Sequence, residues 1–181
     1  MTISATRPVV AVLLGTDHHP FSRLVGWVER LAAEGELGWF VQHGATPLPD
    51  GLPGSAMLSA PALRTLLDRA GAVVTHGGPG LIMEAREAGH MPIVVPRAPV
   101  LGEHVDNHQQ LFTARVAEAG LVTSADGPEQ LRAAVGRALR EGRRPVGATG
   151  VQSAASVRLA GLVDELLEGR RRLVPRPRRV A

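Results

Sequence analysis

The chain has 181 residues, the size of one ordinary domain, and 44% of them are hydrophobic, enough for a buried core. It contains no cysteine, which excludes disulfides and thiolate metal sites and is typical of a reducing compartment. All 20 basic residues are arginines. Residues 1–169 contain 14 of these arginines and all 17 acidic residues, so this part of the chain is slightly acidic and lacks the basic face of a nucleic-acid-binding protein.

Two features of the sequence bear on where the protein works. No apolar run approaches the roughly 20 residues that cross a bilayer. Near the N-terminus, the apolar run Val9–Leu14 is too short for the core of a signal peptide. We therefore expect a cytoplasmic protein.

The first part of the chain alternates between predicted strands and helices. Two apolar runs are predicted strands, namely Val9–Leu14 and Trp39–Gln42, and a third, Ala56–Leu58, is a short strand or an extended segment. Between the first two, apolar residues recur at helical spacing, which predicts an amphipathic helix over about 21–34. After the third, Ser59 is suited to cap a helix with Pro61 early in it.

The middle of the chain has the pattern strand, turn, helix, strand. The apolar run Ala72–Thr75 is followed at once by the glycine-rich turn His76–Gly80. A helical segment then ends at Gly89, and a second apolar run, Ile93–Val95, follows it. This unit is typical of a parallel sheet.

The remaining predicted elements complete an α/β fold. They are a helix over 107–119 with Leu111, Ala114 and Val116 inward, a strand over 121–123, a helix beginning at Pro128, and a last helix over 153–168. We expect five or six parallel strands with helices on both faces. Residues 1–169 would form one domain, and 170–181 a basic Arg/Pro tail.

The turn His76–Gly80 is the strongest candidate for chemistry. In an open parallel sheet, ligands bind beyond the carboxyl ends of the strands. The N-terminus of the next helix offers unpaired N–H groups and partial positive charge, and glycines let the backbone approach a phosphate closely. Pro79 suits the first helical position. The turn is therefore a candidate phosphate site, although a plain tight connection would use similar residues.

Five blocks of this region, in their order, resemble the C-terminal half of family 28 glycosyltransferases. They are His76–Gly80, Glu84–Ala85, Ala88–Gly89, Pro92–Pro96 and Asp106–Gln110. The likeness is greatest to split enzymes of this family, in which a soluble chain binds the nucleotide sugar and a membrane-attached chain supplies the acceptor half. It covers most of residues 8–140. It implies a Rossmann-like sheet equivalent to the C-terminal half of a GT-B glycosyltransferase.

The resemblance implies a set of donor-binding residues. Gly77, Gly78 and Gly80 would hold the diphosphate, and Glu84 would bind the ribose hydroxyls, for which an acceptor-only carboxylate is suited. The other positions are Gly15 and Thr16 at the mouth of the site, Met57 and Leu58 at the nucleotide base, and Asn107, Gln109 and Gln110 at the donor sugar and diphosphate.

Several of these residues also have simpler interpretations. Met57 and Leu58 would be core residues, and Glu84 would lie on a solvated helix face. Asp106 or Asn107 would cap the next helix, with its glutamines in solvent.

His76 and Arg97 have two interpretations each. His76 would donate a hydrogen bond to the diphosphate and stabilise the leaving nucleotide, which makes it a candidate catalytic residue, or it would only hold the turn. Arg97 follows the strand that ends near Pro96. It would be a bidentate donor to a phosphate or sugar carboxylate, or a surface side chain.

A metal site finds little support in the sequence. His104 and His108 have the spacing of helical zinc ligands, but no third ligand is evident, and His18 and His19 are remote in sequence. These two would line the cleft or fill a loop. We expect no metal and no other cofactor.

The expected function is that of a donor-binding subunit. The resemblance implies an inverting glycosyltransferase that moves a hexose-type sugar from a UDP-sugar, such as UDP-N-acetylglucosamine, to a lipid-linked or polysaccharide acceptor. A membrane-bound partner would supply the acceptor half and the general base. The helix 153–168 would dock on the partner or pack on its own domain, and the tail would contact anionic lipid or stay flexible. The alternatives are a non-catalytic nucleotide-sugar-binding module, and a stand-alone UDP-sugar epimerase or hydrolase.

Overall fold

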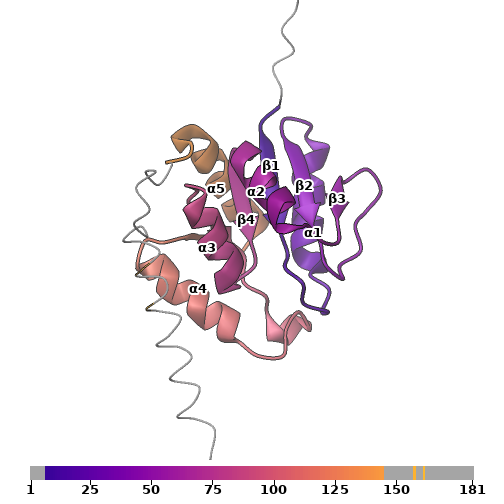
Figure 1. Cartoon of the computed structure of the whole chain (residues 1–181). Helices are drawn as coiled ribbons and strands as arrows, with labels where there is room; N and C mark the ends of the chain where they lie inside the picture. Colours follow the sequence, from indigo (N-terminus) through magenta and orange to yellow (C-terminus); the bar gives the residue numbers. More distant parts are fainter. Residues whose placement is uncertain (1–6, 145–156, 158–160, 162–181) are drawn as a thin grey trace, which may run out of the picture.

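A computed structural model describes residues 7–144, 157 and 161, and its centre is one parallel sheet (Figure 1). The strands are β1 (Val9–Leu13), β2 (Gly38–Gln42), β3 (Gly54–Ser55), β4 (Ala72–Thr75), β5 (Ile93–Val94) and β6 (Thr123–Ser124). Their order across the sheet is β3-β2-β1-β4-β5-β6. This is the order of a doubly wound nucleotide-binding sheet, in which strands β1 to β3 are added toward one edge and β4 to β6 toward the other, so that the strand order reverses between β1 and β4.

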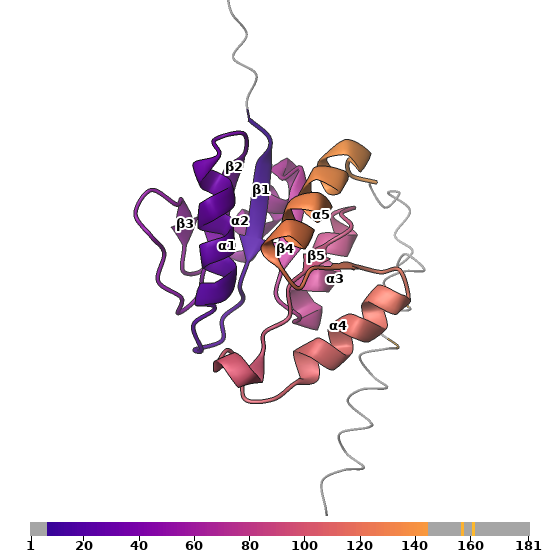
Figure 2. The ribbon, with the colours of Figure 1, turned by 180° about the vertical axis from the view of Figure 1, so that it is seen from behind.

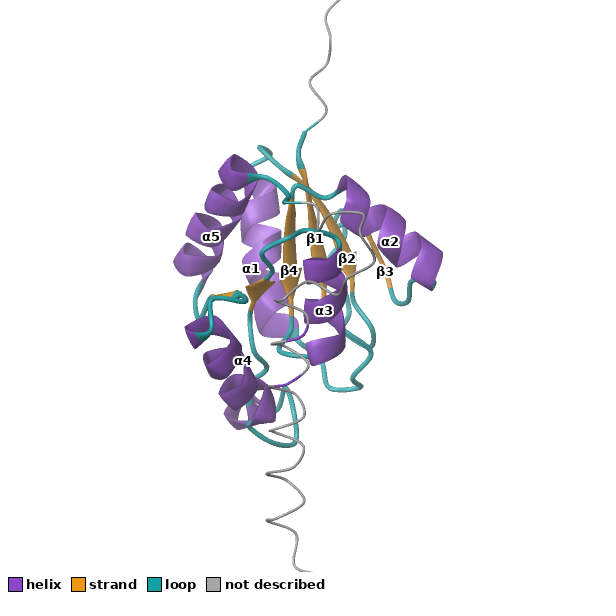
Figure 3. Ribbon diagram, turned by 60° about the vertical axis from the view of Figure 1, so that its left-hand side comes forward, coloured by secondary structure: helices purple, strands orange, loops and turns teal. Residues whose placement is uncertain are grey.

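Helices cover both faces of the sheet. α1 (Ser22–Ala33) and α5 (Pro128–Glu141) pack on one face (Figure 2), and α2 (Ala60–Arg69) and α3 (Pro79–Glu87) pack on the other (Figure 3). α4 (His108–Glu118) packs on the second face with Ile82 of α3 and Val94 of β5. Successive side chains of β1 point to opposite faces, so Val10 and Val12 pack under α1 and α5, and Ala11 and Leu13 under α2 and α3. The predicted fold class is confirmed.

The third strand lies earlier than predicted. β3 is Gly54–Ser55 and pairs with the end of β2, whereas Ala56–Leu58 is not a strand. A Cβ at Gly54 would lie 2.4 Å from the carbonyl oxygen of Val41. The chain therefore approaches β2 at the glycine, and the prediction from apolar residues was wrong by two positions.

The inward face of α4 was predicted correctly at Val116 but wrongly at Leu111 and Ala114. Leu111 and Ala114 are exposed, whereas Phe112, Thr113 and Val116 are buried together with Gln109. The buried positions keep helical spacing, but two of them are polar. A search for apolar residues alone therefore selected the wrong face.

Three predictions lie outside the described residues and stay predictions. They are the helix 153–168, the domain boundary at 169 and the tail 170–181. Within the ranges that the structure does describe, no helix combines the length and the apolar character that crossing a membrane requires.

Candidate functional site

A cavity of about 500 Å³ opens beyond the carboxyl ends of β1 and β4, where the sheet order reverses. Its size is in the range of small-molecule sites. The lining residues come from the loop after β1, the end of β2, the segment around the start of α2, the turn between β4 and α3, the first turn of α3, the segment before α4 and α4 itself. They are Gly15, Thr16, Asp17, Gln42, Met57, Leu58, Leu63, His76, Gly78, Gly80, Leu81, His104 and Gln109.

The structure brings most of the predicted donor-binding residues to this cavity. Eight of them line it: Gly15, Thr16, Met57, Leu58, His76, Gly78, Gly80 and Gln109. Met57 is 61% exposed, so its interpretation as a core residue is wrong. Four predicted residues are not in the lining, namely the buried Gly77 and the exposed Glu84, Asn107 and Gln110.

Glu84 nevertheless lies on the same face of α3 as the cavity. It comes four residues after Gly80 and three after Leu81, both of which line the cavity. Residues at these spacings are neighbours on a helix surface. A ligand that extends out of the cavity along α3 would meet the Glu84 carboxylate one turn further on.

His76 lies between two glycines that leave room for its ring. A Cβ at Gly15 would be 2.6 Å from the ring Cε1, and a Cβ at Gly78 would be 2.2 Å from Nε2. Gly15 also has φ +76°, which other residues rarely adopt. These glycines therefore position the histidine at the mouth of the switch point, a role that the sequence pattern did not reveal.

His76 is neutral at pH 7. Burial, together with the nearby charge of Arg97, lowers the pKa of His76 to about 4. Its Nδ1 lies 3.4 Å from the carbonyl oxygen of Leu13, which can only accept, so the neutral ring carries its proton on Nδ1. Nε2 then holds a lone pair. The predicted donation to a diphosphate therefore requires the protonated ring.

The lowered pKa makes part of the stability depend on pH. The unfolded chain takes up the His76 proton near pH 6.5, whereas the folded chain resists it to about pH 4. As the pH falls from 6.5 to about 4, we expect the contribution of His76 to the free energy of unfolding to decrease by up to about 3 kcal/mol. Above pH 6.5 this contribution should be constant. Urea titrations of the wild type and His76→Gln at several pH values measure it. An equal pH slope in both would exclude His76 as its source.

Gln109 joins the glycine turn to the segment after β5. Its Oε1 accepts from the backbone N–H groups of Gly77 at 3.2 Å and Arg97 at 3.3 Å. Because both partners are donors, the orientation of the amide is fixed. The Gly77 N–H is thus engaged within the protein. Within residues 7–144 the Gln109 NH₂ group has no hydrogen bond, so it offers two donors at the cavity wall.

Gln42 holds the loop after β1 and was not recognised as a site residue. Its amide accepts from the Gly15 N–H at 3.1 Å and donates to the carbonyls of Gly15 at 2.9 Å and Ala56 at 2.8 Å. The sequence signal that could have indicated this role is the position of Gln42, a long polar side chain at the end of an otherwise apolar predicted strand. Gln42 therefore shapes one wall of the cavity.

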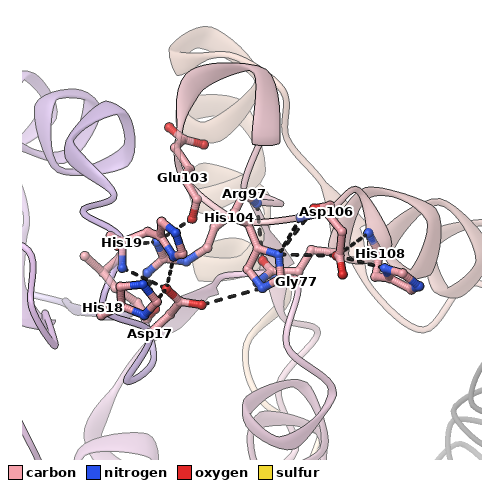
Figure 4. Close-up of polar contacts among 11 residues, drawn as sticks. Asp17, His18, His19, Gly77, Arg97, Glu103, His104, Asp106 and His108 are labelled. Atoms are coloured by element: carbon pink, nitrogen blue, oxygen red, sulfur yellow. Dashed lines mark hydrogen bonds and ion pairs between the residues drawn. The ribbon is translucent and has the colours of Figure 1, made fainter.

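Arg97 contradicts both of its predicted roles, because it is fully buried. Its guanidinium donates to the carbonyls of His19 at 2.6 Å, Leu14 at 3.0 Å and Glu103 at 3.1 Å, and lies 4.7 Å from the centre of the Phe21 ring. Burial lowers its pKa, but a guanidinium keeps its charge. Figure 4 shows Arg97 among the residues of these loops. It ties the loop after β1 to the segment after β5.

The sheet order, the crevice at its switch point and the glycine-rich start of α3 define a Rossmann-like domain equivalent to the C-terminal half of a GT-B glycosyltransferase. Residues 57–160 match the family model of the glycosyltransferase family 28 C-terminal domain. The chain belongs to this family.

Solved structures show the same fold. The glycotransferase of kitacinnamycin is 25% identical with a TM-score of 0.55, over 93% of this chain and 41% of that one. The calicheamicin glycosyltransferase CalG4 is 21% identical with a TM-score of 0.54, over 93% and 40%. This chain thus spans about two fifths of their length.

ALG13 differs from these structures in length. It is 19% identical with a TM-score of 0.54, and the match covers 89% of this chain and 98% of ALG13. At this identity the likeness shows the fold alone. A sequence comparison with curated proteins gave no match.

Proposed function

We propose that this chain is the donor-binding subunit of an inverting glycosyltransferase. It would take a hexose-type sugar from a UDP-sugar and act with a membrane-associated partner chain that holds a lipid-linked or polysaccharide acceptor at the cytoplasmic face. The observation that carries the proposal is the cavity at the switch point, bounded by Gly15, Gly78 and the start of α3, in a chain of this family.

The described residues suit a nucleoside diphosphate in this cavity. The first-turn N–H groups of α3 have no intrahelical partners, and the helix dipole favours negative charge there. The Gln109 NH₂ group adds two donors, and Glu84 would grip the ribose hydroxyls further along α3.

His76 would act in its protonated form, with a proton on Nε2 as well as on Nδ1. A diphosphate close to Nε2 would favour the charged imidazolium, since an opposite charge raises the pKa of a histidine. The ring could then donate to the leaving nucleotide and stabilise its charge without a metal. In this proposal the general base belongs to the partner.

The likeness to ALG13 supports a partner chain that supplies the acceptor half. The match covers 98% of ALG13, but about two fifths of the kitacinnamycin and calicheamicin glycosyltransferases. A partner chain would complete the cleft above the carboxyl ends of the strands, and the helix 153–168 and the Arg-rich tail would help to hold it at the membrane.

Glu84 offers a direct test. We expect Glu84→Ala to weaken the binding of UDP and UDP-sugars at least about tenfold, because a carboxylate that accepts from two hydroxyls is lost. Calorimetry with a panel of nucleotide sugars measures this. Glu87→Ala is the matched control, since Glu87 is an exposed carboxylate one turn further from the cavity on the same helix and should leave the affinity unchanged. Equal affinity of wild type and Glu84→Ala would remove Glu84 from the site.

A further inference from the structure

Three imidazoles gather around one carboxylate at the rim of the cavity (Figure 4). Asp17, His18 and His19 belong to the loop after β1, and His104 to the segment between the short 3-10 helix η1 (Pro99–Leu101) and α4. Asp17 and His104 line the cavity. The carboxyl ends of parallel strands meet at one edge of the sheet, so residues remote in sequence come together here.

The histidine pair singled out by its spacing, His104 and His108, does not lie on one helix, although both rings contact Asp106 Oδ1. His104 precedes α4, which begins at His108, so the two do not lie on consecutive turns of one helix. His108 Nδ1 is instead 2.8 Å from Asp106 Oδ1. The ring of His104 lies 6.3 Å from the ring of His19, centre to centre.

The distances within the cluster suit a shared ion. From the Asp17 carboxylate, Oδ1 is 2.6 Å from His19 Nδ1 and 3.8 Å from His18 Nδ1, and Oδ2 is 3.5 Å from His104 Nε2. One ligand atom each from Asp17, His18 and His19 lie within 4.8 Å of one another. Two ligands of a tetrahedral zinc ion with bonds of about 2.0–2.1 Å are about 3.3 Å apart. Asp17 Oδ1 and His19 Nδ1, which are 2.6 Å apart in a hydrogen bond, would have to move apart to reach this geometry.

Groups behind the cluster orient its members. Asp106 lies behind His104: its Oδ1 is 3.3 Å from His104 Nδ1, its backbone N–H donates to the same nitrogen at 3.3 Å, and Nε2 is the ring nitrogen that faces Asp17. The Asp17 carboxylate accepts from the His19 backbone N–H at 2.8 Å, and Arg97 binds the His19 carbonyl at 2.6 Å. A carboxylate behind a ligating imidazole is the usual outer shell of a metal site. The positive charge of Arg97 opposes a cation, and the single carboxylate offsets it only in part.

We propose that Asp17, His18 and His19 bind a divalent first-row transition metal, with His104 moving in from the second oxygen of the Asp17 carboxylate as the fourth ligand, and with Zn²⁺ as the best fit to imidazole and carboxylate ligands. The ion would join the loop after β1 to the segment before α4 across the rim of the cavity. The site goes beyond the proposed transfer reaction, which uses no metal, and binding of the ion needs no nucleotide.

The test uses the full, untagged chain freed of metal, because a polyhistidine tag would bind the same ions. Calorimetry with Zn²⁺ should give one site per chain with a dissociation constant of about 10 μM or below, and Co²⁺ bound in its place should show visible absorption. His104→Gln and Asp17→Asn should each weaken Zn²⁺ binding at least about tenfold.

His43→Gln is the control, because His43 lies outside the cluster and the cavity, and it should leave Zn²⁺ affinity unchanged. Melting curves of the metal-free variants check that each is folded, and Zn²⁺ should raise the melting temperature of the wild type more than that of His104→Gln. Binding no tighter than about millimolar, or equal affinity in the wild type, His104→Gln and Asp17→Asn, would overturn the proposal.

Discussion

Replacing Arg97 by methionine is expected to lower the free energy of unfolding by about 3–5 kcal/mol. Methionine fills much of the same space but cannot donate, so the buried carbonyls of Leu14, His19 and Glu103 lose a donor at once. The charge of Arg97 is matched by these carbonyls rather than by one removable ion pair. An apolar side chain in its place therefore leaves the three carbonyl oxygens without their hydrogen-bond donor. Urea unfolding at pH 7 measures the loss.

Arg132→Met is the matched control. Arg132 pairs with Glu34 at the surface, and exposed pairs contribute little. We expect a small change in stability for this variant. A loss for Arg97→Met that is no larger than the loss for Arg132→Met would contradict the role of Arg97 in holding the two loops together.

Gly78→Ala is expected to weaken the binding of uridine diphosphate at least about tenfold, which corresponds to about 1.4 kcal/mol. The new Cβ would lie 2.2 Å from His76 Nε2 and 2.8 Å from Cε1, so the ring must rotate away and give up its contact with Leu13. The backbone at Gly78 has φ −84°, which alanine adopts without strain. The loss should therefore appear in binding more than in folding.

Gly26→Ala is the control that shows whether a glycine-to-alanine change weakens ligand binding only at the cavity. Gly26 lies on α1, away from the cavity, and a Cβ there would meet nothing within 4 Å. This variant should keep its affinity for uridine diphosphate and gain stability by about 0.4–1 kcal/mol. Calorimetry with uridine diphosphate measures the affinity of both variants. Unchanged affinity in Gly78→Ala would exclude the His76 ring and the Gly78 backbone from the ligand site.

Local sequence patterns predicted the fold because they act through neighbouring residues. The apolar runs Val9–Leu14 and Ala72–Thr75 are buried strands, and Pro79 stands at the first turn of α3. The boundary of β3 was missed because its position depends on how closely Gly54 approaches Val41, which apolar pattern does not encode.

The site could be predicted only in part, since its other half depends on contacts between distant segments. The glycine turn is a local motif, and it lines the cavity as predicted. Arg97 is buried because carbonyls 83, 78 and 6 residues away converge on it, which no spacing rule detects. The gathering of His19 and His104 follows from strand order, which the sequence alone did not provide.

The most direct measurement is an NMR titration of the ¹⁵N-labelled chain with uridine diphosphate. The largest amide shifts are expected at Gly15, Gly78 and Gly80, with the Gln109 side-chain NH₂ moving as well, because these groups surround the cavity at the switch point. Absence of shifts at millimolar ligand, or largest shifts at a remote hollow such as that lined by Leu31 and Val135, would contradict a diphosphate site at this position.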